Sequence, residues 1–154
     1  MKINIITLGC SKNLVDSEHL AGILKANGHE VLFDSTKKKF EVAIINTCGF
    51  IGDAKEESID VILEYIEEKK KGNIGKIIVF GCLVERYKET LEEEFKEVDA
   101  FFGVNNYLDI ATYLNAKIEN DYFLQRQPST PKHFAYLKIS EGCDRFCSFC
   151  AIPY

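Results

Sequence analysis

The sequence lacks any long hydrophobic stretch: no apolar run approaches the roughly eighteen residues that span a bilayer. The apolar stretch at the start of the chain is too short and too often interrupted by polar residues for a secretory signal. It predicts a strand instead. A formal net charge of −5 gives no basic stripe for nucleic acid. No glycine-rich loop of the G-x-G-x-x-G kind is present, which disfavours a flavodoxin-like nucleotide binder. These absences favour a cytoplasmic protein that does not enter membranes.

The composition is that of a folded protein, with 46% hydrophobic and 28% charged residues among 154. This length allows one ordinary domain and the start of a second. Six cysteines are present. In a reducing compartment, clustered cysteines are more often metal ligands than disulfides.

Aliphatic runs alternate with amphipathic stretches from residue 2 to about residue 116. The predicted strands cover residues 3–8, 29–33, 42–46, 76–80 and 99–102, and the predicted helices cover 13–27, 53–71, 83–96 and 105–116. Such near-continuous aliphatic strands suit a parallel sheet buried on both faces. The pattern predicts a doubly wound, flavodoxin-like α/β fold with five parallel strands, for which the common strand order is 2-1-3-4-5.

The alternation stops after residue 116, so residues 1–116 are predicted to form one α/β domain. Residues 117–133 contain two of the three prolines and little that could be buried, which indicates a linker. Residues 134–140 predict another strand, which leads into a cysteine loop. The sequence given stops soon after that loop, at residue 154, which suggests a fragment of a longer protein.

Three cysteines lie within eight residues of this loop, in the spacing C-x3-C-x2-C: Cys143, Cys147 and Cys150. Thiolates so close together are poorly placed to pair as disulfides, but they can surround one metal centre and leave a coordination position free. Soft sulfur ligands favour iron–sulfur clusters or zinc. The alternative is a zinc knuckle that lacks its fourth ligand.

The other three cysteines each follow a predicted strand: Cys10, Cys48 and Cys82 come after the first, third and fourth. The carboxyl ends of parallel strands share one edge, where open α/β sheets bind ligands. In the order 2-1-3-4-5 these three strands are neighbours, so the thiols are predicted to converge on a second metal centre. The alternative is that small cysteines merely pack the strand ends.

Several polar residues are weaker candidates. Asn13 either supports the Cys10 loop or touches a ligand. Asp16, Ser17 and Glu18 open the first predicted helix, where acids and hydroxyls are expected for capping alone. Asp53 is predicted to cap the second helix.

With both cysteine trios in place, the chain resembles the radical S-adenosylmethionine methylthiotransferases. The matching segments are TLGCSKNLVDSE (7–18), NTCGF (46–50), GC (81–82) and KISEGCDRFCSFCAIP (138–153). The segments CSKNLVD and ISEGC resemble the RimO-like branch, which modifies an aspartate β-carbon of the twelfth small-subunit ribosomal protein. The alternative branch of the family modifies adenosine in tRNA.

The resemblance implies two 4Fe-4S clusters and a radical mechanism that uses S-adenosylmethionine. Cys10, Cys48 and Cys82 would hold the first cluster, and Cys143, Cys147 and Cys150 the radical-generating one. Phe149 would contact the adenine of the cofactor or fill the mouth of a barrel. A ribosomal protein substrate, a reductant such as flavodoxin or ferredoxin and a sulfur donor are the implied partners.

The chain departs from the family pattern because it supplies only the first strand and cluster loop of the expected radical barrel, at residues 134–154. We therefore expect this strand to lack its partners and the chain alone to be inactive as an enzyme. A non-catalytic zinc or iron–sulfur binding module remains the alternative from another functional class.

Overall fold

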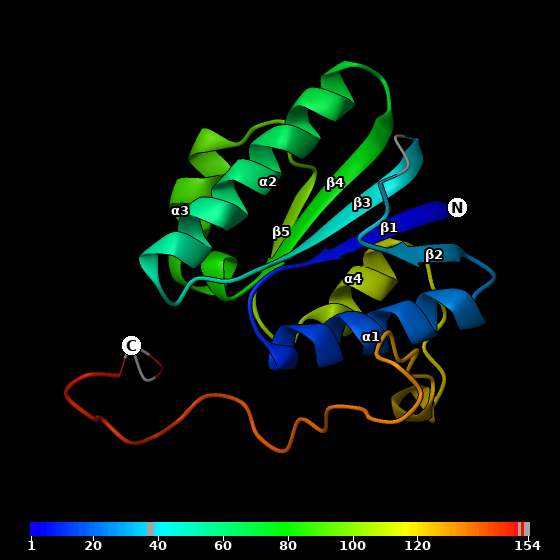
Figure 1. Cartoon of the computed structure of the whole chain (residues 1–154). Coiled ribbons are helices and arrows are strands. Elements are labelled where there is room, and N and C mark those ends of the chain that lie inside the picture. Colours follow the sequence, from blue (N-terminus) through cyan, green and yellow to red (C-terminus); the bar gives the residue numbers. More distant parts are fainter. Residues whose placement is uncertain (37–38, 151, 153–154) are drawn as a thin grey trace.

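A computed structural model describes residues 1–36, 39–150 and 152 of the chain. The remaining positions, three of which belong to the predicted segment 134–154, lie outside the described residues. Strands and helices follow one another in the predicted order (Figure 1). The elements are β1 (Lys2–Thr7), α1 (Ser11–Ala26), β2 (Glu30–Phe33), β3 (Phe40–Thr47), α2 (Gly52–Lys70), β4 (Ile74–Gly81), α3 (Cys82–Glu94), β5 (Ala100–Phe102), α4 (Tyr107–Tyr113) and the 3-10 helix η1 (Tyr122–Leu124).

The five strands form one parallel sheet in the order β2-β1-β3-β4-β5, which confirms the predicted topology. Its register pairs Ile5 with Ile44 and Ile44 with Ile78, so aliphatic side chains line up across the central strands. Strands β1, β3 and β4 are neighbours, and their carboxyl ends lie at one edge. This arrangement positions the residues that follow those strands.

The central strand β3 contributes to two hydrophobic cores. Ile44 packs with residues of α1 and α4, whereas Ile45 packs with residues of α2 and α3. Successive side chains of a strand point to opposite faces, so an aliphatic run fills both cores. Figure 1 shows the two helix pairs on opposite faces of the sheet. The fold is therefore the predicted doubly wound α/β sandwich.

The bounds of all four helices differ from the prediction by one to three residues, and two of these differences have a clear physical reason. Helix α4 is shorter than predicted because Asn105 and Asn115, which flank it, adopt left-handed conformations with φ of 62° and 59°. Helix α2 begins after Ile51, and no side chain caps it, so the predicted cap at Asp53 is wrong. Asp53 instead lies in the first helical turn, where its charge favours the positive end of the helix dipole.

No strand forms among the described residues after α4. The strand predicted at residues 134–140 is absent from the structure, and Leu137 and Ile139 are 81% and 87% exposed. A lone strand has no neighbour for its backbone hydrogen bonds, which is why the segment stays irregular. It runs beside α1 in extended form (Figure 1). None of the helices in the described ranges is long and apolar enough to cross a bilayer.

Candidate metal centre

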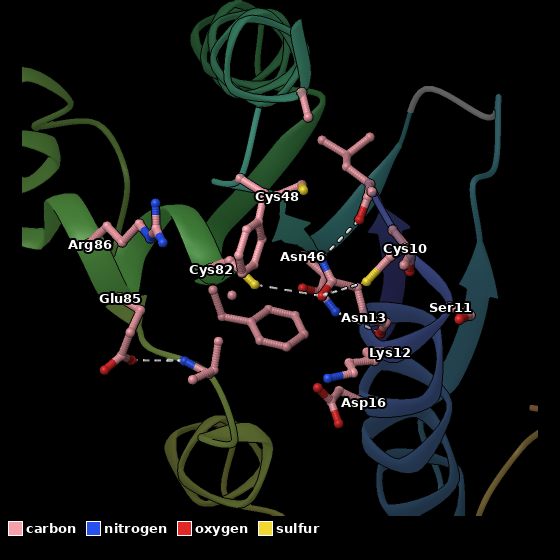
Figure 2. Close-up of a pocket in the computed structure, with 18 of the residues that line it drawn as sticks. Cys10, Ser11, Lys12, Asn13, Asp16, Asn46, Cys48, Cys82, Glu85 and Arg86 are labelled. Carbon is pink, nitrogen blue, oxygen red and sulfur yellow. Dashed lines mark hydrogen bonds between the residues drawn. The ribbon is translucent and has the colours of Figure 1, made fainter. Parts of the chain in front are cut away.

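Three cysteines converge at the carboxyl edge of the sheet. Cys10 immediately precedes α1, Cys48 follows β3, and Cys82 is the first residue of α3. All three line one open cavity of about 1100 Å³ (Figure 2). The topology thus brings together the side chains that the sequence analysis placed on adjacent strand ends. Their ligation of a metal stays a prediction.

Asn13 stands between two of these thiols. Its Oδ1 atom lies 4.0 Å from Cys10 Sγ and 3.9 Å from Cys82 Sγ. Its Nδ2 group donates to the carbonyl oxygens of Leu8 (2.9 Å) and Thr47 (3.1 Å), at the ends of β1 and β3. These bonds fix the amide, so its oxygen faces the two sulfur atoms. Asn13 therefore supports the Cys10 loop, one of the two roles considered from the sequence.

Cys48 is held between a helix and a glycine turn. Its backbone N–H donates to Ser58 Oγ of α2 at 3.1 Å. On the other side lies Gly9, with φ of 86°, where an added Cβ would come within 2.9 Å of Cys48 Sγ. Only glycine adopts this backbone conformation without strain and leaves room for the sulfur. The turn before Cys10 is thus shaped to accept Cys48.

A buried polar layer lies beneath the cysteines. Asn46 Nδ2 donates to the Asn13 carbonyl (2.8 Å) and to Ser17 Oγ (3.0 Å), and Thr7 Oγ1 donates to Ser17 Oγ (2.8 Å). Ser17 and Asn46 are 0% and 1% exposed. Buried polar groups that are all paired specify one arrangement of the elements that carry them. This layer joins α1 to β1 and β3 directly below the cavity.

The cavity favours the protonated form of the Cys82 thiol. Burial, together with the neighbouring thiols of Cys48 and Cys10, raises the pKa of Cys82 to about 11. A bound metal reverses this preference, because a coordinating thiol loses its proton. The N-termini of α1 and α3 begin at Cys10 and Cys82 and direct N–H groups and positive dipole ends towards the cavity. They would stabilise a net negative metal–thiolate centre.

The donor set predicted from the sequence consists of three thiols. Thiolates select iron–sulfur clusters or zinc. A single zinc ion needs sulfur atoms about 2.3 Å away, and hence only about 4 Å from one another. In the described part of the chain, no three His, Cys, Asp or Glu side chains are arranged to hold a metal ion as they stand. Between Cys10 and Cys82 lies the Asn13 oxygen instead.

The second trio is not gathered in the same way. Cys143 and Cys147 are exposed and Cys150 is half-buried, with one backbone bond from Cys150 N–H to the Cys147 carbonyl (3.0 Å). Phe149 is 91% exposed, so its predicted contact with adenine stays a prediction. Residues beside this loop nevertheless border the first cavity, namely Glu141, Gly142 and Ile152.

Comparison with known proteins identifies the family of the chain. Residues 2–103, which carry the sheet and the first three cysteines, match the model of a family described as uncharacterized protein family UPF0004. The chain belongs to this family.

Three curated relatives of this UPF0004 chain are each named ribosomal protein uS12 methylthiotransferase RimO. The chain is 55% identical to the protein of Phocaeicola vulgatus over 151 residues, and 56% identical to that of Bacteroides fragilis over 151. Identity to the protein of Porphyromonas gingivalis is 50% over 152 residues. These alignments cover 98% or 99% of the chain but only 35% of each relative.

Sequence analysis misjudged the acidic opening of α1 in this UPF0004 chain. Asp16, Ser17 and Glu18 were expected to serve helix capping alone, yet none caps the helix and all three are buried. Ser17 lies four residues after Asn13 and three before Leu20, and this spacing places the three on one helix face. That periodicity was the available signal for Ser17. Asp16 and Glu18 are buried by a segment from the far end of the chain.

Proposed function

We propose that the chain is the N-terminal part of a methylthiotransferase that adds a methylthio group to the β-carbon of an aspartate in ribosomal protein uS12. Cys10, Cys48 and Cys82 would hold one 4Fe-4S cluster. Cys143, Cys147 and Cys150 would hold a second, which binds S-adenosylmethionine beside Phe149. The convergence of three thiols from three strand ends on one cavity carries this proposal, and the name of the relatives supports the substrate.

The residues of the chain have defined tasks in this proposal. When bound, the two clusters and S-adenosylmethionine supply the sulfur and radical chemistry. Asn13 and Asn46 hold the loops of the first trio at fixed spacing. The N-termini of α1 and α3 stabilise the negative charge of the thiolates.

The remaining parts of the proposed reaction lie with partners and with the whole protein. A reductant such as flavodoxin or ferredoxin would supply electrons, and a separate donor would supply sulfur. The cytoplasm would provide both the ribosomal protein and the reducing conditions that keep the six thiols available. The chain alone is proposed to bind clusters without completing turnover.

Anaerobic reconstitution with iron and sulfide tests the proposal. We expect a brown, oxygen-sensitive protein with about eight iron atoms per chain, which corresponds to two four-iron clusters. Colourless protein that retains one or two zinc ions would instead support a non-catalytic zinc module. Iron and sulfide analysis with the visible absorbance spectrum distinguishes these outcomes.

Single substitutions in the two trios provide matched controls for each other. Cys48→Ala should halve the iron content and leave the cluster on the second trio intact. Cys143→Ala should halve it by removing the other cluster. If Cys48→Ala retains the full iron and sulfide content, Cys48 is not a ligand and the proposed first cluster is wrong.

A further inference from the structure

Helix α1 contacts a segment that lies more than a hundred residues further along the chain. We infer that residues 125–141, called the strap below, dock along α1 in a fixed register that sets the position of the second cysteine trio relative to the first. Contacts made later in the strap fall nearer the N-terminus of α1, where Cys10 lies. The strap therefore runs antiparallel to the helix, towards the cavity. Its role in catalysis rests on the proposed function.

The strap first meets the helix at Gly22. A Cβ atom at this position would overlap the backbone carbonyl oxygen of Gln125. Glycine inside a helix costs about 1 kcal/mol relative to alanine, because it raises the entropy of the unfolded chain. Here the missing side chain lets the strap backbone lie directly against the helix.

Glu18, one helical turn closer to Cys10, is the main anchor. Its carboxylate accepts two hydrogen bonds from Arg126 (2.8 and 2.6 Å) and two from the backbone and hydroxyl of Ser129 (2.6 and 2.8 Å). Its backbone carbonyl accepts a fifth from Gln127 N–H at 3.0 Å. The side chain is 0% exposed. Burial alone would raise the pKa of Glu18, but the Ser129 and Arg126 hydrogen bonds outweigh it and lower the pKa.

Every one of these Glu18 partners belongs to the strap. A buried carboxylate is costly unless its oxygen atoms are fully paired, so an undocked strap would leave one unpaired charge at Arg126 and one at Glu18. Arg126 donates through Nε and Nη2 to one Glu18 oxygen while Ser129 donates to the other, so both oxygens are held in fixed directions that an apolar contact would not impose. Glu18 is therefore a positioning residue for the strap.

Asp16 forms the next contact. Both of its oxygen atoms lie 2.8 Å from Lys138 Nζ, which also donates to Asn105 Oδ1 at 3.2 Å and pairs with Glu141. Lys138 thus joins α1, the turn before α4 and the strap. Only a few residues separate it from Cys143.

The strap ends at the cavity of the first trio. Glu141 and Gly142 line this cavity together with Cys10 and Lys12. The loop that carries Cys143, Cys147 and Cys150 is therefore delivered to the rim of the first centre. A reaction that passes a group between two centres requires them to be held at short range.

Hydrogen exchange measured by mass spectrometry tests the docking in the 154-residue chain. The Gln127 and Ser129 amides donate to Glu18, so they report on the strap directly. Glu18→Gln removes charge-assisted bonds and should speed their exchange about tenfold or more. Gly22→Ala should do the same by lifting the strap, although alanine favours the helix itself.

Two matched variants serve as controls. Glu92→Gln neutralises an exposed carboxylate paired with Lys88, and Gly52→Ala adds a methyl group where nothing lies within 4 Å. Both should leave the exchange of Gln127 and Ser129 within twofold of the parent, as surface changes usually do. Unchanged exchange in both Glu18→Gln and Gly22→Ala would overturn the docking register.

The reconstituted protein separates this inference from the proposed function. With both clusters reduced, magnetic coupling between them should broaden the electron paramagnetic resonance signal, and Glu18→Gln should reduce that broadening without loss of iron. Full iron content with unchanged broadening in Glu18→Gln would overturn the positioning role. If the parent chain binds no iron, the proposed function fails, while hydrogen exchange still decides whether the strap docks.

Discussion

The two cysteine trios are built by opposite means. Cys10, Cys48 and Cys82 are distant in sequence, and a parallel sheet brings them together above a buried polar layer. The second trio is compact in sequence but lies in an exposed loop. Adjacent strands fix positions through backbone hydrogen bonds before any ligand binds. Closeness in sequence guarantees proximity but not orientation, so the second site depends on contacts made elsewhere.

The largest expected difference is between the core of the sheet and the loop of the second trio, and it concerns how much a buried or exposed aromatic side chain contributes to stability. Phe80 is 2% exposed in the core with α1 and α4, whereas Phe149 is 91% exposed. Phe80→Ala should lower the free energy of unfolding by about 3–5 kcal/mol, since it leaves a cavity. Phe149→Ala should change it by about 0.5 kcal/mol or less. Urea denaturation of both variants measures this, and equal losses would contradict the contrast.

Thiol reactivity should distinguish the trios next. Because the pKa of Cys82 is raised from 9.0 to about 11, its thiolate fraction at pH 8 should be about a hundredfold below that of an ordinary thiol. In metal-free protein, iodoacetamide should label the exposed Cys143 before Cys82. The Cys82 rate should rise with pH up to about pH 11. Mass spectrometry of digested samples measures each site, and equally fast labelling of Cys82 at pH 8 would refute its protected state.

Removing hydrogen bonds from the polar layer beneath the first trio should lower the stability of the fold by an intermediate amount. Asn46→Ala removes the donors to the Asn13 carbonyl and to Ser17, so it should destabilise the fold by about 1–3 kcal/mol. Thermal unfolding compared with the exposed control Asn120→Ala measures this. If the two variants unfold alike, the layer contributes nothing specific to the site.

The smallest expected effect is the pH dependence of the strap. The folded pKa of Glu18 lies below its usual 4.5, so its ionised form stabilises the docked state above that pH. This contribution is lost as pH falls through the lowered value. The stability difference between the parent and Glu18→Gln should therefore shrink as pH drops from 6 towards 3. Urea midpoints across this range measure it, and a constant difference would contradict the assignment.

The sheet could be predicted from sequence because its signals are local. Aliphatic runs such as residues 42–46 alternate with helical periods, and the position of each cysteine after a strand follows from the order of elements. The turn before α4 and the start of α2 were less predictable. Asn105 adopts a left-handed conformation, and α2 begins after Ile51, which places Asp53 inside the first helical turn.

The polar contacts of α1 could not be predicted for a different reason. An acid near a helix start has the same sequence signal whether it caps the helix or binds a distant cation. The partners of Glu18 and Asp16 lie 108 and 122 residues away, at Arg126 and Lys138. The predicted linker 117–133 therefore includes residues that complete a buried ionic cluster.

The bare backbone of Gly22 has a practical consequence for anyone who wishes to excise the α/β unit. A piece trimmed at the predicted boundary, Ala116, would strip the cover from α1. It would expose to solvent the face of α1 that carries Glu18 and Gly22, while the apolar face of the helix would stay against the sheet. Extending the excised piece through Ser129 would keep the Glu18 anchor. Replacing Gly22 by alanine would stabilise the helix only in the shorter piece, because the longer piece contains the Gln125 carbonyl that an alanine Cβ would overlap.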